Sequence, residues 1–341
     1  MNFSSLIPTA SDGIVTGRIV DDQGNPVEGA VVRLSGTQNR KFITDANGFY
    51  RFENVETGGF YIVTPSRVNY TFSPATRSFT VLGETTEAAF GANRTDGTLN
   101  PLDTPEYYVR QHYLDFLGRE PDEDGFNFWS DQILGCGSDQ ECISLKRENV
   151  SAAYFFSIEF QRTGGLVDGL YRASYGARPN FSEFMPDTRA VGLGVQVGKD
   201  GWEAKLQANK EAFVAAFVNR PAFRAVYDGM DNSTFVETLI NHTGVSFTAA
   251  ERDELLGGLT TGNLTRAEVL SSIAENSRFM NAKFNETFVM MEYFGYLRRD
   301  ADADGFAFWL GKLNQFNGNF QQAEMVKAFI VSGEYRDRFP R

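Results

Sequence analysis

Cysteine and histidine, the residues that often build metal and nucleophilic centres, are almost missing from this chain. Its 341 residues include 2 cysteines and 2 histidines, whereas a zinc site usually needs about four such ligands close together. His112 falls among aromatic residues of a helical pattern, His242 falls near a helix end, and neither has a Ser or Cys motif beside it. We therefore expect no enzymatic activity, and packed or helix-capping roles for both imidazoles.

Positive charge and long apolar runs are scarce as well. The 32 Lys and Arg residues are outnumbered by 44 Asp and Glu residues, which gives a net charge of -12. This balance argues against nucleic acid, because binding a phosphate backbone needs a basic face. No apolar run reaches the roughly 18 residues of a membrane span. The opening stretch MNFSSLIPTASDG has neither the basic start nor the apolar run of a signal peptide.

The two cysteines lie close together in the stretch GCGSDQEC. Five residues separate Cys136 from Cys142, and Gly137 among them lets the loop curl. With no third cysteine nearby, the pair predicts an intramolecular disulfide, and the alternative is a loop with two reduced thiols. A disulfide suits an oxidising compartment, so we expect an extracellular or cell-surface location.

The chain has enough apolar and aromatic residues for a sizeable core, and its pattern changes near residue 100. Residues 13–92 alternate β-branched and aromatic residues in short runs that are cut by Gly, Asn and Pro. This pattern predicts an antiparallel β-sandwich, in which Asn47-Gly48 is the clearest hairpin signal. We expect an N-terminal extension at 1–12 and a polar linker at 93–104 on either side of this domain.

The sandwich segment contains GRIVDDQGNPVEGAVVRL followed by TDANGFYRFENV. It resembles the carboxypeptidase regulatory-like domain, a transthyretin-like sandwich of secreted and cell-surface proteins. The resemblance implies a module that supports or spaces other domains and carries no catalysis. Some related sandwiches form Lys-Asn isopeptide bonds, but no family motif places an Asn and a catalytic acid beside Lys41, so we expect no such crosslink.

Residues 105–341 change to a helical period and predict an all-α domain. Tyr107, Arg110, Leu114 and Leu117 line one face of the first helix, which Gly118 ends. Further helices are predicted at 144–162, 165–175, 202–218, 232–242, 248–256, 265–278, 283–297 and 320–333. The fold class is therefore multidomain, with an all-β sandwich followed by an all-α domain.

The helical domain contains an internal repeat. The segment HYLDFLGREPDEDGFNFWSDQI (112–133) aligns without a gap with EYFGYLRRDADADGFAFWLGKL (292–313), and SIEFQR (157–162) is echoed by SGEYRD (332–337). Two copies, near 107–162 and 284–338, indicate one packing unit of helix, acidic turn and helix that is used twice.

Both copies carry an Arg, an Asp three residues on, a Gly three further and a Trp four beyond that. These residues are Arg119, Asp122, Gly125 and Trp129 in the first copy and Arg299, Asp302, Gly305 and Trp309 in the second. The pattern resembles the bacterial domain of unknown function DUF4214, and the likeness extends over most of 105–341. The resemblance implies a place near the C-terminus of secreted proteins and brings no enzymatic activity with it.

The acidic turns of the repeat have two interpretations. A calcium loop needs oxygens at positions 1, 3 and 5, Gly at 6 and an acid at 12. The first copy fits this spacing with Glu120, Asp122, Asp124 and Asp131, whereas the second copy has Gly311 at the closing position. The interpretation that we favour is helix N-capping, with acids that complement the helix dipole and with Trp129 and Trp309 as core anchors.

Two functions remain open from the sequence. The first is a non-enzymatic structural protein outside the cell that associates with itself, as a filament or surface-layer subunit, or with the cell envelope. The second is an accessory module that binds a glycan or another protein. An assembly role draws on Phe3, Leu6 and Ile7, apolar residues of the N-terminal extension that could add to a sheet edge of a neighbouring subunit or fold back on their own sandwich. No cofactor is expected apart from possible calcium.

Overall fold

The computed structural model describes residues 12–339 and divides into two compact units. Unit 1 contains the residues up to Tyr113, then Glu120–Arg147 and the segment from Arg336, and unit 2 contains Leu114–Arg119 and Glu148–Tyr335. Neither unit is a single continuous stretch of chain. The units are defined by spatial contact, so the domain boundaries at 12, 92 and 104 that the sequence pattern predicts stay predictions.

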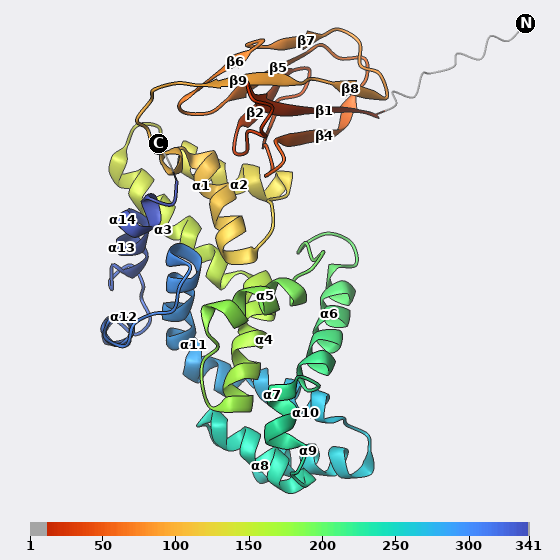
Figure 1. The fold of residues 1–341 in the computed structure, drawn as a ribbon, viewed down its shortest axis with the longest axis vertical. Coiled ribbons are helices and arrows are strands. Elements are labelled where there is room, and N and C mark those ends of the chain that lie inside the picture. The colour runs from red at the N-terminus through yellow and green to blue at the C-terminus, as the bar shows by residue number, and fades with distance from the viewer. Residues whose placement is uncertain (1–11, 340–341) are drawn as a thin grey trace, which may run out of the picture. The chain divides into compact units, whose positions relative to one another are not determined.

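The N-terminal part of unit 1 is a β-sandwich of two sheets, as predicted (Figure 1). The first sheet has the order β4-β1-β9-β6, with β8 beside β1, and the second has the order β3-β2-β5-β7. The strands of the first sheet are β1 (Asp12–Asp21), β4 (Phe49–Glu56), β6 (Tyr70–Ser73), β8 (Thr85–Glu87) and β9 (Phe90–Arg94). Those of the second are β2 (Val31–Gly36), β3 (Arg40–Ile43), β5 (Tyr61–Ser66) and β7 (Arg77–Phe79).

Two details of the sandwich differ from the sequence prediction. Strand β1 pairs in parallel with both β8 and β9, so the first sheet is mixed and not wholly antiparallel. Asn47-Gly48 does form a turn, in which the Asp45 carboxylate accepts hydrogen bonds from the N–H groups of Asn47 and Phe49, both at 2.9 Å. The strands it joins, β3 and β4, belong to different sheets, because β4 pairs with β1. The hairpin prediction was therefore wrong.

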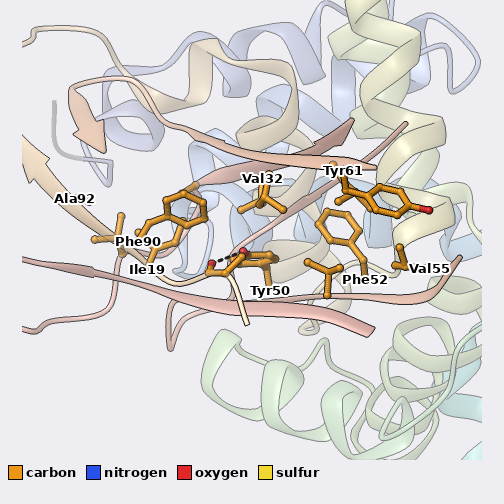
Figure 2. Packing of buried hydrophobic residues seen from close by; sticks show 14 of the residues in the cluster. Ile19, Val32, Tyr50, Phe52, Val55, Tyr61, Phe90 and Ala92 are labelled. Atoms are coloured by element: carbon orange, nitrogen blue, oxygen red, sulfur yellow. Dashed lines mark hydrogen bonds between the residues drawn. The ribbon is translucent and has the colours of Figure 1, made fainter. Parts of the chain in front are cut away.

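The core of the sandwich lies between the two sheets and comes from alternate residues of their strands (Figure 2). Ile19, Tyr50, Phe52 and Phe90 of the first sheet face Val32 and Tyr61 of the second. The Tyr50 hydroxyl donates a hydrogen bond to the Ala88 carbonyl, which satisfies a polar group inside the core. This period-2 burial is the physical basis of the alternation in the sequence.

Unit 1 also contains helices. They are the short 3-10 helix η1 (Pro101–Asp103), α1 (Pro105–His112), α2 (Glu123–Leu134) and the beginning of α3 (Gln140–Phe156). Both α1 and α2 pack against the edge strand β3. The segment from Arg336 joins the same unit, where the Arg336 guanidinium makes two 2.9 Å hydrogen bonds to the Asp103 carboxylate.

Unit 2 is helical and is organised around α4, which packs against α5, α8, α10 and α11. Its helices are the end of α3, α4 (Ile158–Tyr175), α5 (Phe181–Val191), α6 (Trp202–Phe217), α7 (Pro221–Tyr227), α8 (Asn232–Thr243), α9 (Ala249–Thr261), α10 (Arg266–Ala274), α11 (Ser277–Glu292), α12 (Ala303–Gln315), α13 (Met325–Val331) and α14 (Gly333–Arg336). A π-helical turn follows α1 at Tyr113–Leu117 and another follows α11 at Tyr293–Leu297.

Helix boundaries account for the other differences. The helix predicted over 144–162 is two helices, because Ser157 is extended and its hydroxyl accepts a 3.1 Å hydrogen bond from the Phe160 N–H at the start of α4. Helices α5 and α7 were not predicted. The first has Pro186 inside it, which interrupts the helical pattern, and the second has only 7 residues, too few for a clear helical period. None of the described helices combines the length and apolar character needed to cross a bilayer.

Candidate functional site: the repeated acidic turns

The acidic turns begin helices α2 and α12. The Asp122 carboxylate accepts a 2.9 Å hydrogen bond from the Gly125 N–H, and the Asp302 carboxylate accepts a 2.7 Å bond from the Gly305 N–H. Both aspartates have extended backbone dihedrals, as N-cap residues do. The capping interpretation of the two turns is confirmed.

In both copies the arginine of the motif binds a glutamate from the shorter repeated segment, which is SIEFQR (157–162) in the first copy and SGEYRD (332–337) in the second. Arg119 makes two 2.8 Å hydrogen bonds to Glu159, and Arg299 makes bonds of 2.6 and 3.1 Å to Glu334. These bidentate pairs explain why SIEFQR and SGEYRD repeat along with the turns. The bond from Arg299 also lowers the pKa of Glu334.

The serine of the same segment caps a helix in each copy. Ser157 accepts from the Phe160 N–H at 3.1 Å, and Ser332 accepts from the Tyr335 N–H at 3.2 Å. The two hydroxyls also donate to carbonyls three residues earlier, at 2.7 and 2.8 Å. The shorter repeated segment therefore supplies a helix cap and an ion-pair partner in each copy, and both roles are structural.

The glycine of the motif is required by a tyrosine ring. A Cβ added at Gly125 would meet the Tyr113 hydroxyl, and one added at Gly305 would meet the Tyr293 hydroxyl, both well inside the 3.0 Å that real Cβ atoms keep. Both rings are buried, each with 4% of its surface exposed. The Tyr and Gly of the repeat thus form one close contact in each copy, which the sequence alignment did not reveal.

The aromatic residues of the motif divide between core and surface. Phe126 and Phe306 are buried, at 0% and 9% exposure, whereas Phe128 and Phe308 are 56% and 54% exposed. Trp129 and Trp309 are only half-buried. The core anchors are therefore the two phenylalanines directly after the glycines, and the prediction that the tryptophans serve as core anchors was wrong. In each N-capped helix this phenylalanine lies on the face that packs against the core, whereas the tryptophan lies at the border between that face and the solvent-exposed face.

The four residues predicted to bind calcium do not converge on one point. The Glu120 carboxylate accepts hydrogen bonds of 2.8 and 2.6 Å from Arg110, Asp122 caps α2, and Asp131 pairs with Lys41. Asp124 lies in the first turn of α2. Within residues 12–339, no three His, Cys, Asp or Glu side chains gather as a metal site requires. The spacing matches a calcium loop, but the helix that starts at Glu123 turns the ligands apart.

Cys136 and Cys142 form a disulfide with α-carbons 5.6 Å apart. The bond closes the turn between α2 and α3, and both cysteines are half-buried. Cys136 follows α2 and Cys142 lies in the first turn of α3, so the crosslink is a local one that the sequence spacing is able to indicate.

The histidines hold structural positions. His112 is fully buried in α1, and its Nδ1 lies 2.8 Å from the Tyr108 carbonyl. Burial lowers the pKa of His112 to about 3, so the imidazole is neutral in the folded protein. The Nδ1 of His242, in the last turn of α8, lies 3.0 Å from the Ala173 carbonyl.

The acidic turn of the first copy meets the sandwich within unit 1. Three consecutive residues of β3 contact α2: Arg40 pairs with Glu123, Lys41 pairs with Asp131, and the Phe42 ring lies 5.9 Å from the Phe126 ring in an edge-on arrangement. Lys41 is only 9% exposed. We define these three residue pairs as the β3–α2 brace. The sequence signal for the brace was Lys41 itself, because it occupies an inward-facing strand position where the alternation of apolar and polar residues predicts an apolar side chain.

The edges of the sheets are short or covered in the described part of the chain. Strand β3 packs against α1 and α2, and β6 and β7 have four and three residues. On β4, the Glu53 carbonyl accepts from Arg40 and the Asn54 carbonyl accepts from Gln38 at 3.5 Å. Such coverage is how proteins protect sheet edges from unwanted pairing. Phe3, Leu6 and Ile7, the predicted assembly residues, lie outside the described residues.

Family models match both parts of the chain. The carboxypeptidase regulatory-like domain matches residues 14–91, and the domain of unknown function DUF4214 matches residues 271–339. The second match covers the second copy of the repeat and not the first. No curated protein matches the sequence.

Several solved structures resemble part of the chain at low overall similarity. The TIE protein of Bacillus anthracis is 19% identical, with a TM-score of 0.23, over 25% of this chain and 17% of that one. A streptococcal ancillary pilin is 15% identical, with a TM-score of 0.22, over 26% and 33% of the two chains. BcpA, the major pilin subunit of Bacillus cereus, is 16% identical, with a TM-score of 0.20, over 25% and 31%. The chain spans a third or less of the length of these structures, and likenesses this limited carry no functional argument.

The two domain assignments rest on the family matches together with the observed fold. The first match lies on the sandwich, and the second contains the capped turn, the Arg299–Glu334 pair and the contact between Tyr293 and Gly305. The chain therefore contains a carboxypeptidase regulatory-like domain in its N-terminal part and a DUF4214 domain in its C-terminal part.

Proposed function

We propose that the chain is a non-enzymatic structural module of an extracellular or cell-surface protein, in which the sandwich and the first acidic turn form one rigid element. The observation that carries this proposal is the β3–α2 brace. Domains joined by a polar linker move relative to one another by default, unless their interface is substantial. Here two ion pairs and an aromatic contact hold β3 against α2, and of the four charged side chains only Asp131 is exposed, at 64%.

Rigidity is what a spacer or subunit of a surface assembly needs, and it has no obvious use in a freely tethered module. The carboxypeptidase regulatory-like family match and the disulfide support a location outside the cell, because a disulfide persists in an oxidising compartment. Self-association, through the N-terminal extension or through other surfaces, is part of the proposal.

The brace is tested by limited proteolysis of the full chain. Replacing Lys41 with Ala leaves the Asp131 carboxylate without its partner and is expected to speed cleavage in the segment 93–104, because the linker, exposed at 93–99, then unfolds locally more often. Replacing Arg51, whose pair with Glu53 is exposed on the surface, is the matched control and is expected to leave the cleavage rate unchanged. Equal rates for the two variants would refute a rigid connection.

Assembly is tested separately by light scattering and negative-stain microscopy of the full chain and of a chain without residues 2–10. Filaments, sheets or a defined oligomer are expected for the full chain. A full chain that stays monomeric at high concentration would refute self-association. A truncated chain with unchanged assembly would refute the role of Phe3, Leu6 and Ile7.

A further inference from the structure

A hollow of about 400 Å³ lies between helices α11 and α12 of unit 2. Its lining includes the side chains of Asn281, Asn285 and Asn314, together with Phe284 and Leu310. This volume falls in the range of small-molecule sites, which combine apolar walls with a few convergent polar groups. None of these residues belongs to the capped turn or to the brace.

The amide groups of the hollow keep hydrogen-bonding atoms available to a ligand, because Asn281 and Asn314 are exposed to solvent and Asn285 is half-buried. The Asn285 Nδ2 donates a 2.8 Å bond to the Asn314 Oδ1, and this bond holds the two helices' side chains together. The Asn285 Oδ1, the Asn314 Nδ2 and the whole Asn281 amide have no hydrogen-bond partner within residues 12–339. Amides offer donors and acceptors side by side, which is the pattern that vicinal sugar hydroxyls match.

An aromatic surface adjoins these amides. The Phe284 ring on the wall of the hollow stacks on Phe156, with ring centroids 5.8 Å apart and planes at 23°. Phe156 is 44% exposed although it belongs to this cluster. Flat aromatic faces beside amide groups suit a sugar ring, whose axial C–H groups pack on an aromatic face while its hydroxyls hydrogen-bond at the edge.

The charges around the hollow indicate a neutral ligand. Glu286 also lines the hollow, but its carboxylate accepts bonds of 2.7 Å from Arg172 and 3.3 Å from Lys283. These partners compensate the carboxylate, and the remaining lining side chains carry no charge. An anionic ligand would find no free cation among the lining residues, and a cationic ligand would compete with two groups that are already in place.

We propose that the hollow between α11 and α12 binds a neutral oligosaccharide, with Asn281, Asn285 and Asn314 bonding to hydroxyl groups and Phe284 packing against a sugar face. The inference goes beyond the structural role proposed above and does not depend on it. Binding would attach the DUF4214 domain to a carbohydrate surface.

The test is a titration of the full chain with chitopentaose and with cellopentaose, followed by ligand-observed NMR. Binding of at least one of them is expected, and Asn281→Ala and Asn314→Ala are expected to weaken it by about tenfold, the effect of one to two net hydrogen bonds. The matched control is Asn263→Ala, an exposed asparagine of the same unit that does not line the hollow, and it is expected to bind as the parent chain does.

The salt dependence of the affinity distinguishes a site for a neutral ligand from a site for a charged one. Affinity is expected to stay constant between about 0.05 and 0.5 M salt, since a neutral ligand is not subject to screening. Melting curves check folding. Asn281→Ala removes no side-chain hydrogen bond to any residue in 12–339, so it should melt like the parent chain. The proposal is overturned if neither sugar binds, if the two hollow variants bind as well as the control, or if binding disappears at high salt.

Discussion

Because Gly305 contacts Tyr293 closely, we expect Gly305→Ala to lower the stability of the protein, which is the opposite of what helix propensity alone predicts. Gly305 lies in the first turn of α12, where replacing Gly with Ala would normally stabilise a helix by up to about 1 kcal/mol. Here the new methyl group would overlap the Tyr293 hydroxyl. The ring has little room to move, because it is buried and packs edge-on against Phe329 with centroids 5.1 Å apart.

The expected cost follows from these opposing effects. Overpacking by one methyl group costs about 1–3 kcal/mol, so after a propensity gain of about 1 kcal/mol Gly305→Ala should destabilise unit 2 by up to roughly 2 kcal/mol. At about 2–4 °C per kcal/mol, its melting temperature should fall by up to roughly 8 °C. Gly311→Ala in the same helix is the matched control. A Cβ there meets nothing within 4 Å, so this variant should be neutral or slightly more stable.

A double-mutant cycle identifies the cause. Tyr293→Phe removes the overlapping oxygen, so Gly305→Ala should be much less harmful when it is combined with Tyr293→Phe, with a coupling energy of about 1–2 kcal/mol measured by urea unfolding. The reasoning is wrong if Gly305→Ala is as well tolerated as Gly311→Ala, or if the tyrosine substitution restores nothing. The first copy, with Gly125 and Tyr113, should behave in the same direction.

Further predictions concern pH, the disulfide and calcium. His112 has a folded-state pKa of about 3 against 6.5 when unfolded, so its contribution to stability should be lost as pH falls from about 6.5 towards 3, and His112→Gln should flatten the fall in melting temperature over that range. Burial raises the pKa of Glu292, one of whose carboxylate oxygens has no hydrogen-bond partner within residues 12–339, so stability should fall as pH rises above the ordinary value of 4.5. Glu292→Gln should then raise the melting temperature at pH 8 more than at pH 4, and an equal gain at both would contradict a titrating carboxyl. Reducing the Cys136–Cys142 bond should cost about 2 kcal/mol, from the entropy of its short loop, and unchanged urea unfolding after reduction would count against it. The melting temperature should be the same with added calcium and with a chelator. A melting temperature that rises with calcium, and no longer rises in Asp131→Ala, would show that the first acidic turn does bind calcium.

Much of the fold followed from local patterns. Alternation predicted the sandwich, and the change of period near residue 100 predicted the helices, because burial on one face repeats every two residues in a strand and every 3.6 in a helix. Pairing was harder to predict. Asn47-Gly48 makes its turn, yet β4 continues to β1 in the other sheet, since the partner of a strand depends on the whole sandwich and not on the turn before it.

The candidate site divides in the same way. The caps at Asp122 and Asp302 bond to an N–H three residues on, so a few neighbouring residues suffice to specify them. The hollow between α11 and α12 could not be predicted, because Asn285 and Asn314 meet across 29 residues through the packing of two helices. No local pattern distinguishes these asparagines from ordinary surface residues.

The sequence by itself determined the two kinds of domain, the repeat and the groups that bond within one turn of chain. The tertiary structure alone decided the partners of those charged residues that pair across long stretches of chain. Arg119 meets Glu159 across 40 residues and Lys41 meets Asp131 across 90. The physical reason is that a capping bond is fixed once a helix starts, whereas an ion pair between distant residues forms only after the elements that carry them have packed. The sequence left a calcium loop open beside the favoured capping interpretation, and the fold uses Asp122 as a cap and Glu120 and Asp131 as ion-pair partners.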